Sequence, residues 1–122
     1  MADERNARMK EVLTTMFDTP DPSGGLMDIA PMKLAMEYIF GEVWSRPGLD
    51  PKLRSVAVIS LLAARGGADY ELGHHLRIGL RNGLSEDEIY ELLLHVGTYA
   101  GAAALGGSMK LAQEVFAAEK AK

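Results

Sequence analysis

The sequence contains no cysteine among its 122 residues. This absence excludes disulfides, zinc–thiolate sites, iron–sulfur clusters and every redox or nucleophilic mechanism that needs a thiol. The glycine patterns of nucleotide-binding loops and the H-E-x-x-H signature of a zinc site are missing as well. We therefore expect neither a cofactor nor a bound metal.

Strong positive charge and long apolar segments are also lacking. The 13 basic and 17 acidic residues give a net charge of −4, which argues against nucleic acid as the principal partner. No segment approaches the roughly 20 apolar residues of a membrane span, and residues 1–5 are too charged for the start of a signal peptide. We expect a cytoplasmic protein with no nucleic-acid or membrane partner.

The residues that are present predict an all-α fold. Apolar residues make up 48% of the sequence and charged residues 25%, a composition typical of a single domain over residues 1–122. Within most segments the apolar residues recur near the helical period of about 3.6. About six helices are expected, over residues 3–17, 31–44, 51–65, 68–82 and 86–100, with a last helix that reaches toward 118 and restarts near 108. Residues 1–29 form the first helix and a loop arm.

Capping residues support two of these helix boundaries, and the apolar surface of two helices indicates an oligomer. Ser85 and Glu88 have the spacing of a capping box, and Asn82-Gly83 is suited to a left-handed helix end. The helices over 51–65 and 86–100 are apolar around most of their circumference, which is more than a monomer of this size can cover. Small residues over 101–107 permit close helix contact. We therefore expect a homo-oligomer.

A candidate acid–base pair lies on the predicted helix over 68–82. Glu71 and His75 are four residues apart and share one face, so the carboxylate can hold the imidazole in one tautomer. The pair flanks an apolar stripe that includes Leu72 and Leu76, where partial burial and a charged neighbour can tune an acid or base toward neutral pH. The alternative is an ordinary helical Glu–His contact with no role in catalysis.

A second stripe lies on the helix over 86–100, where Glu91, His95 and Tyr99 follow one another at intervals of four residues. Leucines and Val96 flank His95, so we expect its ring to be shielded from water and its charged form to be disfavoured. The pattern makes His95 a candidate for catalysis and Tyr99 a candidate for substrate contact. The alternative is a core or interface histidine whose hydrogen bonds are satisfied by Tyr99 or by a carbonyl.

Two arginines near a tryptophan form a third group. The planar guanidinium groups of Arg46 and Arg54 suit carboxylate ligands, and Trp44 is placed to form the wall of a pocket. The alternative is a pair of surface arginines near the start of a helix.

Three blocks of sequence carry a resemblance to a known family. The blocks are W-S-R-P-G-L-D-P-K-L-R-S over residues 44–55, E-L-G-H-H-L-R-I-G-L-R-N-G-L-S-E-D-E-I over 71–89, and Y-A-G over 99–101. Together they resemble the carboxymuconolactone decarboxylase family, and the similarity extends over residues 40–116, roughly two thirds of the chain.

The resemblance implies an alkylhydroperoxidase-like helical bundle that assembles into trimers or hexamers, with a pocket near subunit contacts. One branch of the superfamily uses a C-x-x-C pair, and because cysteine is absent, thiol peroxidase chemistry is excluded here. The other branch is cofactor-free. Its best-known reaction belongs to aromatic compound degradation and converts 4-carboxymuconolactone into an enol-lactone. The conjugated lactone carbonyl accepts the electrons left when carbon dioxide departs.

Site residues follow from the matching positions of the family. The resemblance implies that His75 protonates the dienolate intermediate and that Glu71 orients it. Arg46 and Arg54 fall on positions that bind carboxylates or hold the pocket wall. His95 stands where relatives carry Gln or His and is expected to donate a hydrogen bond to the lactone oxygen.

Two departures from the family pattern leave other functions open. Residues 102–107 are alanine, leucine and glycine where relatives have a proline and polar side chains, and the first forty residues match only loosely. A cofactor-free isomerase or hydrolase of a related lactone is one alternative. A non-catalytic oligomeric binding or accessory protein is another.

Overall fold

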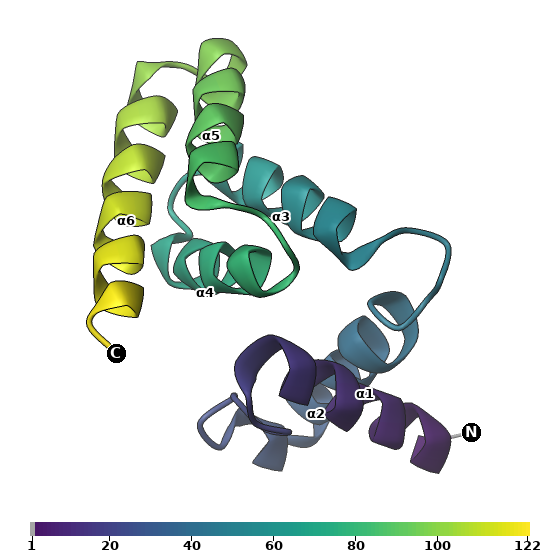
Figure 1. Ribbon diagram of the computed structural model, residues 1–122. Helices are drawn as coiled ribbons and strands as arrows, with labels where there is room; N and C mark the ends of the chain where they lie inside the picture. The colour runs from purple at the N-terminus through teal and green to yellow at the C-terminus, as the bar shows by residue number, and fades with distance from the viewer. Residues whose placement is uncertain (1) are drawn as a thin grey trace. The chain divides into compact units, whose positions relative to one another are not determined.

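The computed structural model describes residues 2–122, in which every regular element is a helix and no strand occurs (Figure 1). The elements are α1 (Ala2–Phe17), the 3-10 turn η1 (Leu26–Asp28), α2 (Ala30–Tyr38), the π-helical turn η2 (Ile39–Val43), α3 (Pro51–Arg65), α4 (Asp69–Arg81), α5 (Glu86–Ala100) and α6 (Ala102–Lys120). The predicted all-α class is confirmed. The chain divides after Asp50 into two compact units, and each is described by itself.

The first unit packs α1 against α2 and η2. Its buried apolar residues come from both sides of this contact: Met9, Leu13, Met16, Met36, Phe40 and Trp44. The α1 members recur at intervals of three and four residues, which places them on one helix face. Burial of this face holds α1 onto the segment that leads to Trp44.

The segment before Trp44 departs from the predicted continuous α-helix. The α2 helix begins at Ala30 with Pro31 in its first turn, as the fixed φ of proline favours, but from Ile39 the chain winds as a π-helix. The Trp44 N–H donates to the Ile39 carbonyl, five residues back, at 2.9 Å. Such single π-helical turns are rare and occur often at functional sites.

The second unit is a bundle of α3, α4, α5 and α6. The most extensive contact in this unit is between α5 and α6, which run side by side in opposite directions (Figure 1). One cluster of buried residues joins the four helices: Ile59, Ala63, Leu72, Leu76, Leu84, Ile89, Leu93, Ala112, Val115 and Phe116. The apolar stripe predicted for the fourth helix therefore lies in this core.

Apart from the end of α2, most predicted boundaries are confirmed, and the expected restart of the last helix is wrong. The Ser85 hydroxyl accepts from the Glu88 N–H at 3.0 Å while the Glu88 carboxylate accepts from the Ser85 N–H at 2.9 Å, so the capping box is complete. Gly83 has a φ of +105°, as a left-handed end requires. The expected restart near Ser108 does not occur, because α6 is continuous from Ala102. Packing of its apolar face on α5 outweighs the modest cost of two internal glycines.

Large apolar side chains remain exposed on the second unit. Leu53 and Leu61 on α3 and Leu94 and Tyr99 on α5 are each at least 47% exposed. These helices therefore bury one face within the chain and present apolar surface on another. The homo-oligomer that would cover this surface stays a prediction. Among residues 2–122, no helix combines the length and the apolar character of a membrane span.

The contact between α5 and α6 generates a stability prediction. A Cβ atom on Gly97 would lie 2.5 Å from the Leu105 Cβ, whereas one on Gly106 would meet nothing within 4 Å. We expect Gly97→Ala to lower the free energy of unfolding by about 1–3 kcal/mol through overpacking. The matched control, Gly106→Ala, is expected to raise it by up to about 1 kcal/mol, since alanine favours the helix. Urea unfolding of both variants measures this, and equal effects would contradict the close approach of the two helices.

Candidate functional site

The α4 helix places His75 at the boundary of the core. Leu72 and Leu76 of the same helix are buried in the cluster. The His75 side chain is half-buried. Its Nδ1 atom is shielded from solvent. Glu71, one turn earlier, is exposed. The imidazole therefore has one nitrogen inside the unit, at the core boundary where the sequence predicts the pair, whereas the Glu71 side chain lies on the surface.

The surroundings of His75 hold it neutral. Burial lowers the pKa of His75 from 6.5 to about 4, with a further lowering by the charge of His74, while the Glu71 carboxylate acts in the opposite direction. Burial dominates because it removes the hydration that an imidazolium needs. At neutral pH the imidazole of the free protein is therefore uncharged. Its pKa lies below the value near neutral pH that the sequence predicts for an acid or base at this position.

A group of contacts around His74 on α4 was not predicted from the sequence. The His74 ring packs edge-on against Tyr70 with a centroid distance of 4.6 Å, and an Arg77 guanidinium nitrogen lies 3.5 Å from the His74 Nδ1. Because arginine can only donate, a hydrogen bond at this contact needs the His74 Nδ1 as its acceptor. Burial and then the charge of Arg77 lower the pKa of His74. The four- and three-residue spacings of these side chains were the available signal.

The structure does not bear out the expected shielding of His95. This side chain is exposed, and Tyr99 is 82% exposed. The α5 helix turns Leu93 and Gly97 into the core, and His95 lies midway between them in sequence, about 200° around the helix from each. The two rings do meet, with centroids 5.4 Å apart. Flanking leucines were therefore a poor guide to the burial of His95.

The candidate arginines lie in different units. In the second unit Arg54 is half-buried on α3 with its Nε shielded from solvent, next to the buried Ser55. The Asn82 side chain donates to the Ser55 hydroxyl at 3.0 Å and thus ties the end of α4 to α3. In the first unit Arg46 is exposed, while Trp44 is buried and stacks on Phe40 at 6.5 Å. Trp44 is thus part of a core within its own unit.

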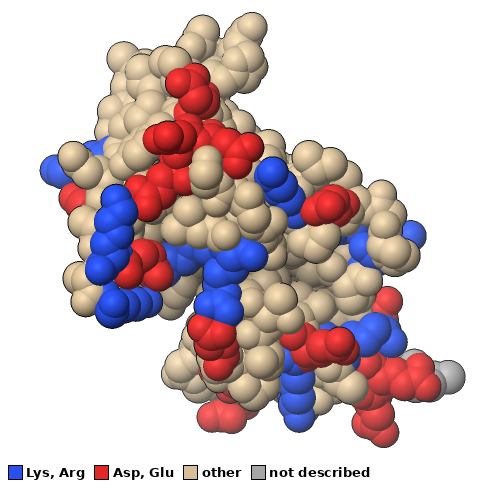
Figure 2. Space-filling view, in the orientation of Figure 1, with Lys and Arg blue, Asp and Glu red and all other residues tan. Residues whose placement is uncertain are grey.

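A surface hollow on the second unit has the wrong charge for an anionic ligand. It has a volume of about 480 Å³ and is lined by Val56, Leu84, Asp87, Glu88, Glu91 and Leu92. Figure 2 shows acidic side chains gathered over α5, whose first turn holds Glu86, Asp87 and Glu88. Three carboxylates repel a carboxylated molecule, so this hollow is not a candidate substrate site. Within residues 2–122, no three acidic or histidine side chains are placed to hold a metal ion.

Comparisons with known proteins support the family that the three sequence blocks resemble. The model of the carboxymuconolactone decarboxylase family matches residues 30–114, a segment that holds every candidate site residue. The chain is 48% identical over 79 residues to 4-carboxymuconolactone decarboxylase of Acinetobacter baylyi, covering 65% of this chain and 58% of that protein. It is 44% identical over 69 residues to nitrosuccinic acid decarboxylase of Metarhizium robertsii, covering 57% and 48%.

A third relative has no assigned activity. It is an uncharacterized 15.0 kDa protein of Paracoccus denitrificans, 31% identical over 85 residues, with 69% of this chain and 63% of that protein covered. The chain thus spans less than two thirds of the length of each of these relatives. The family model, by contrast, covers well over half of the chain. The chain therefore belongs to the carboxymuconolactone decarboxylase family.

Proposed function

We propose that this protein is a cofactor-free decarboxylase of a small carboxylated compound, with a carboxylated lactone as the leading substrate. Membership of the family and the names of two relatives support a decarboxylation. The observation that carries the proposal is the half-buried imidazole of His75 within the matched segment. A shielded site of this kind can move a proton without competition from bulk water.

The named substrates of the two relatives share one chemical property. Carboxymuconolactone has a conjugated lactone carbonyl and nitrosuccinic acid has a nitro group. Each group can hold the electron pair that remains when carbon dioxide leaves, so the electron sink belongs to the substrate. An enzyme for such acids has to bind the carboxylate, stabilise the resulting anion and supply one proton.

His75 is proposed to supply that proton in its imidazolium form. In the free protein its low pKa keeps the ring neutral, but a bound carboxylate nearby stabilises the charged form and raises this pKa. The carbon–carbon bond to the carboxylate then breaks, and its electron pair enters the lactone to give a dienolate. The imidazolium transfers its proton to carbon, and the neutral imidazole takes a new proton from solvent when the next substrate carboxylate binds.

The other candidate residues are assigned roles around this step. Arg46 and Arg54 bind substrate carboxylates through paired N–H donors. Glu71 orients His75, and His95 donates a hydrogen bond to the lactone oxygen, with Tyr99 beside it. Trp44, buried in the first unit, acts by supporting the segment before Arg46.

The first test compares two adjacent histidines. We expect His75→Gln to lower the rate of carbon dioxide release at least a hundredfold, in the range measured for loss of a general acid. His74→Gln is the matched control and should keep the rate within about tenfold, since His74 donates no proton in the proposed step. The assay measures carbon dioxide from 4-carboxymuconolactone and from nitrosuccinic acid.

Two outcomes would contradict this function. If the folded wild type releases no carbon dioxide from either acid and His75→Gln only lowers the melting temperature, a binding or accessory role replaces it. If solvent protons exchange into the lactone without gas release, an isomerase is indicated.

The second test follows stability against pH. His75 binds a proton in the unfolded chain near pH 6.5 but in the folded protein only near pH 4, so the unfolded state binds more protons between these values. The free energy of unfolding should therefore fall as the pH is lowered from about 6.5 to about 4, by at most about 3 kcal/mol.

Replacement of His75 isolates this effect. His75→Gln should reduce the slope of the pH profile between these limits, measured by urea unfolding, and the slope that remains includes the contribution of His74, whose pKa is also lowered. Carboxylates with a lowered pKa, such as Glu42 and Glu88, also lose stabilising free energy in acid. That loss begins at a lower pH than the loss from His75, near the usual pKa of a glutamate. An unchanged slope in His75→Gln would show that the imidazole is not held neutral by burial.

A further inference from the structure

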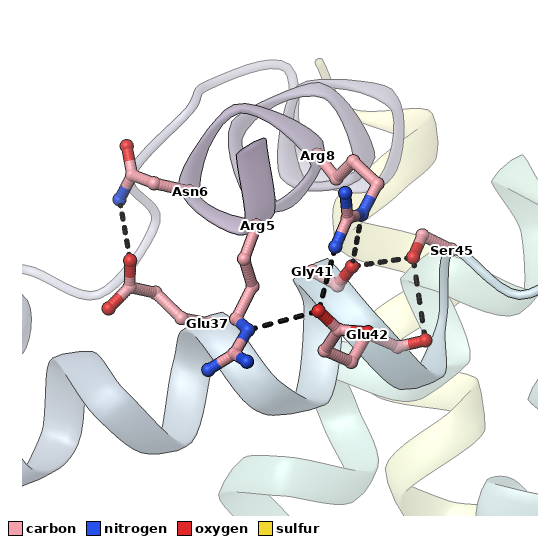
Figure 3. Close-up of polar contacts among 7 residues, drawn as sticks. All are labelled: Arg5, Asn6, Arg8, Glu37, Gly41, Glu42 and Ser45. Atoms are coloured by element: carbon pink, nitrogen blue, oxygen red, sulfur yellow. Dashed lines mark hydrogen bonds and ion pairs between the residues drawn. The ribbon is translucent and has the colours of Figure 1, made fainter. Parts of the chain in front are cut away.

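The π-helical turn η2 ends three residues before Arg46, and side chains of α1 hold it in place. Glu42 lies in this turn and accepts two hydrogen bonds on one carboxylate oxygen, from Arg5 Nε at 3.0 Å and from an Arg8 terminal nitrogen at 2.7 Å. Figure 3 shows both guanidinium groups reaching from α1 to this single carboxylate. We call the set of Arg5, Arg8, Gly41, Glu42 and Ser45 the Glu42 clamp.

The clamp also holds the backbone of the turn. The Gly41 carbonyl accepts from Arg8 Nε at 2.9 Å and from the Ser45 hydroxyl at 2.6 Å (Figure 3). Arg8 therefore spans two consecutive residues of the turn, one through its backbone and one through its side chain. A Cβ atom on Gly41 would collide with the backbone carbonyl of Arg5. The α1 backbone thus passes directly over the π-helical turn.

Short backbone bonds carry this constraint to Arg46. The Trp44 N–H is bound to the Ile39 carbonyl, and the Arg46 N–H donates to the Val43 carbonyl at 3.2 Å. The Trp44 side chain is fixed in the core, and Ser45 belongs to the clamp itself. The direction in which Arg46 leaves the helix therefore depends on where the turn is held.

We propose that Glu42 is a positioning residue, which fixes the π-helical turn between Arg5 and Arg8 and thereby sets the direction in which Arg46 presents its guanidinium group to a carboxylate. This inference rests on the carboxylate-binding role assigned to Arg46 under the proposed function. Glu42 and Arg46 lie inside the segment that matches the family, residues 30–114, whereas the Arg5 and Arg8 side chains that hold Glu42 lie before it.

The clamp contributes more to geometry than to overall stability. The Arg5, Arg8 and Glu42 side chains are 36–39% exposed, and ion pairs with this exposure add little to the free energy of unfolding. The hydrogen bond from Arg5 lowers the pKa of Glu42, so the carboxylate stays charged near neutral pH. Without that charge the two guanidinium groups lose their common anion, while Met9 and Leu13 still hold α1 in place.

A double-mutant cycle on the full chain tests the proposal. The probe is muconolactone, a stable butenolide that carries one carboxylate, titrated while the fluorescence of Trp44 is recorded. Trp44 is the one tryptophan of the sequence and stands directly after the turn. The variants are Glu42→Gln, Arg46→Gln and the double variant. The matched control is Glu37→Gln, which removes the charge from another carboxylate that contacts α1 outside the turn, the acceptor of the 3.1 Å bond from Asn6 (Figure 3).

We expect Glu42→Gln and Arg46→Gln each to raise the dissociation constant about tenfold, and the double variant to bind no more weakly than Arg46→Gln. Glu37→Gln should bind as the wild type does. If Arg46→Gln weakens binding and Glu42→Gln does not, or if the two effects add, the positioning role is refuted while the proposed function stands. If Arg46→Gln binds as the wild type does, the carboxylate-binding role of Arg46 fails and the positioning role fails with it.

Discussion

Burial of the apolar stripe of α4 is the constraint on which the second unit depends. Leu72 and Leu76 enter the cluster that joins all four of its helices, and α4 packs against both α3 and α6. Once these two side chains are inside, the rotation of α4 about its axis is fixed. His75 then has to lie at the edge of the core, where its imidazole is half-buried and neutral. The packing that stabilises the fold also sets the protonation state of the candidate proton donor.

A histidine that is uncharged in the free protein suits a substrate that carries both a carboxylate and a group able to accept an electron pair. In the proposed reaction, the bound carboxylate favours the imidazolium only when substrate is present, and the proton is then held where the anion forms. The acidic surface over α5 repels carboxylates from that part of the second unit. Guanidinium groups at Arg46 and Arg54 have the opposite sign and the planar geometry that a carboxylate prefers. Charge therefore makes the acidic surface over α5 unfavourable for the proposed substrate.

Local sequence was a good guide wherever a side chain acts on its own helix. The capping box at Ser85 and the partial burial of His75 both follow from spacing within one or two turns, and both are present. Sequence failed where neighbours on other elements decide the outcome. His95 has an apolar local context yet is exposed, because packing of α5 follows Leu93 and Gly97. The glycines that were expected to interrupt α6 lie inside a continuous helix for the same reason.

The sequence by itself determined the helical segments, the exclusion of thiol chemistry and the helix face that carries His75, because each depends on composition or on spacing along a single helix. Only the tertiary structure decided the π-helical turn and the contacts of Glu42. Its partners Arg5 and Arg8 precede it by 37 and 34 residues, a separation at which no helical period relates the side chains. Their meeting depends on how the apolar face of α1 packs against Phe40 and its neighbours, which is a property of the folded unit.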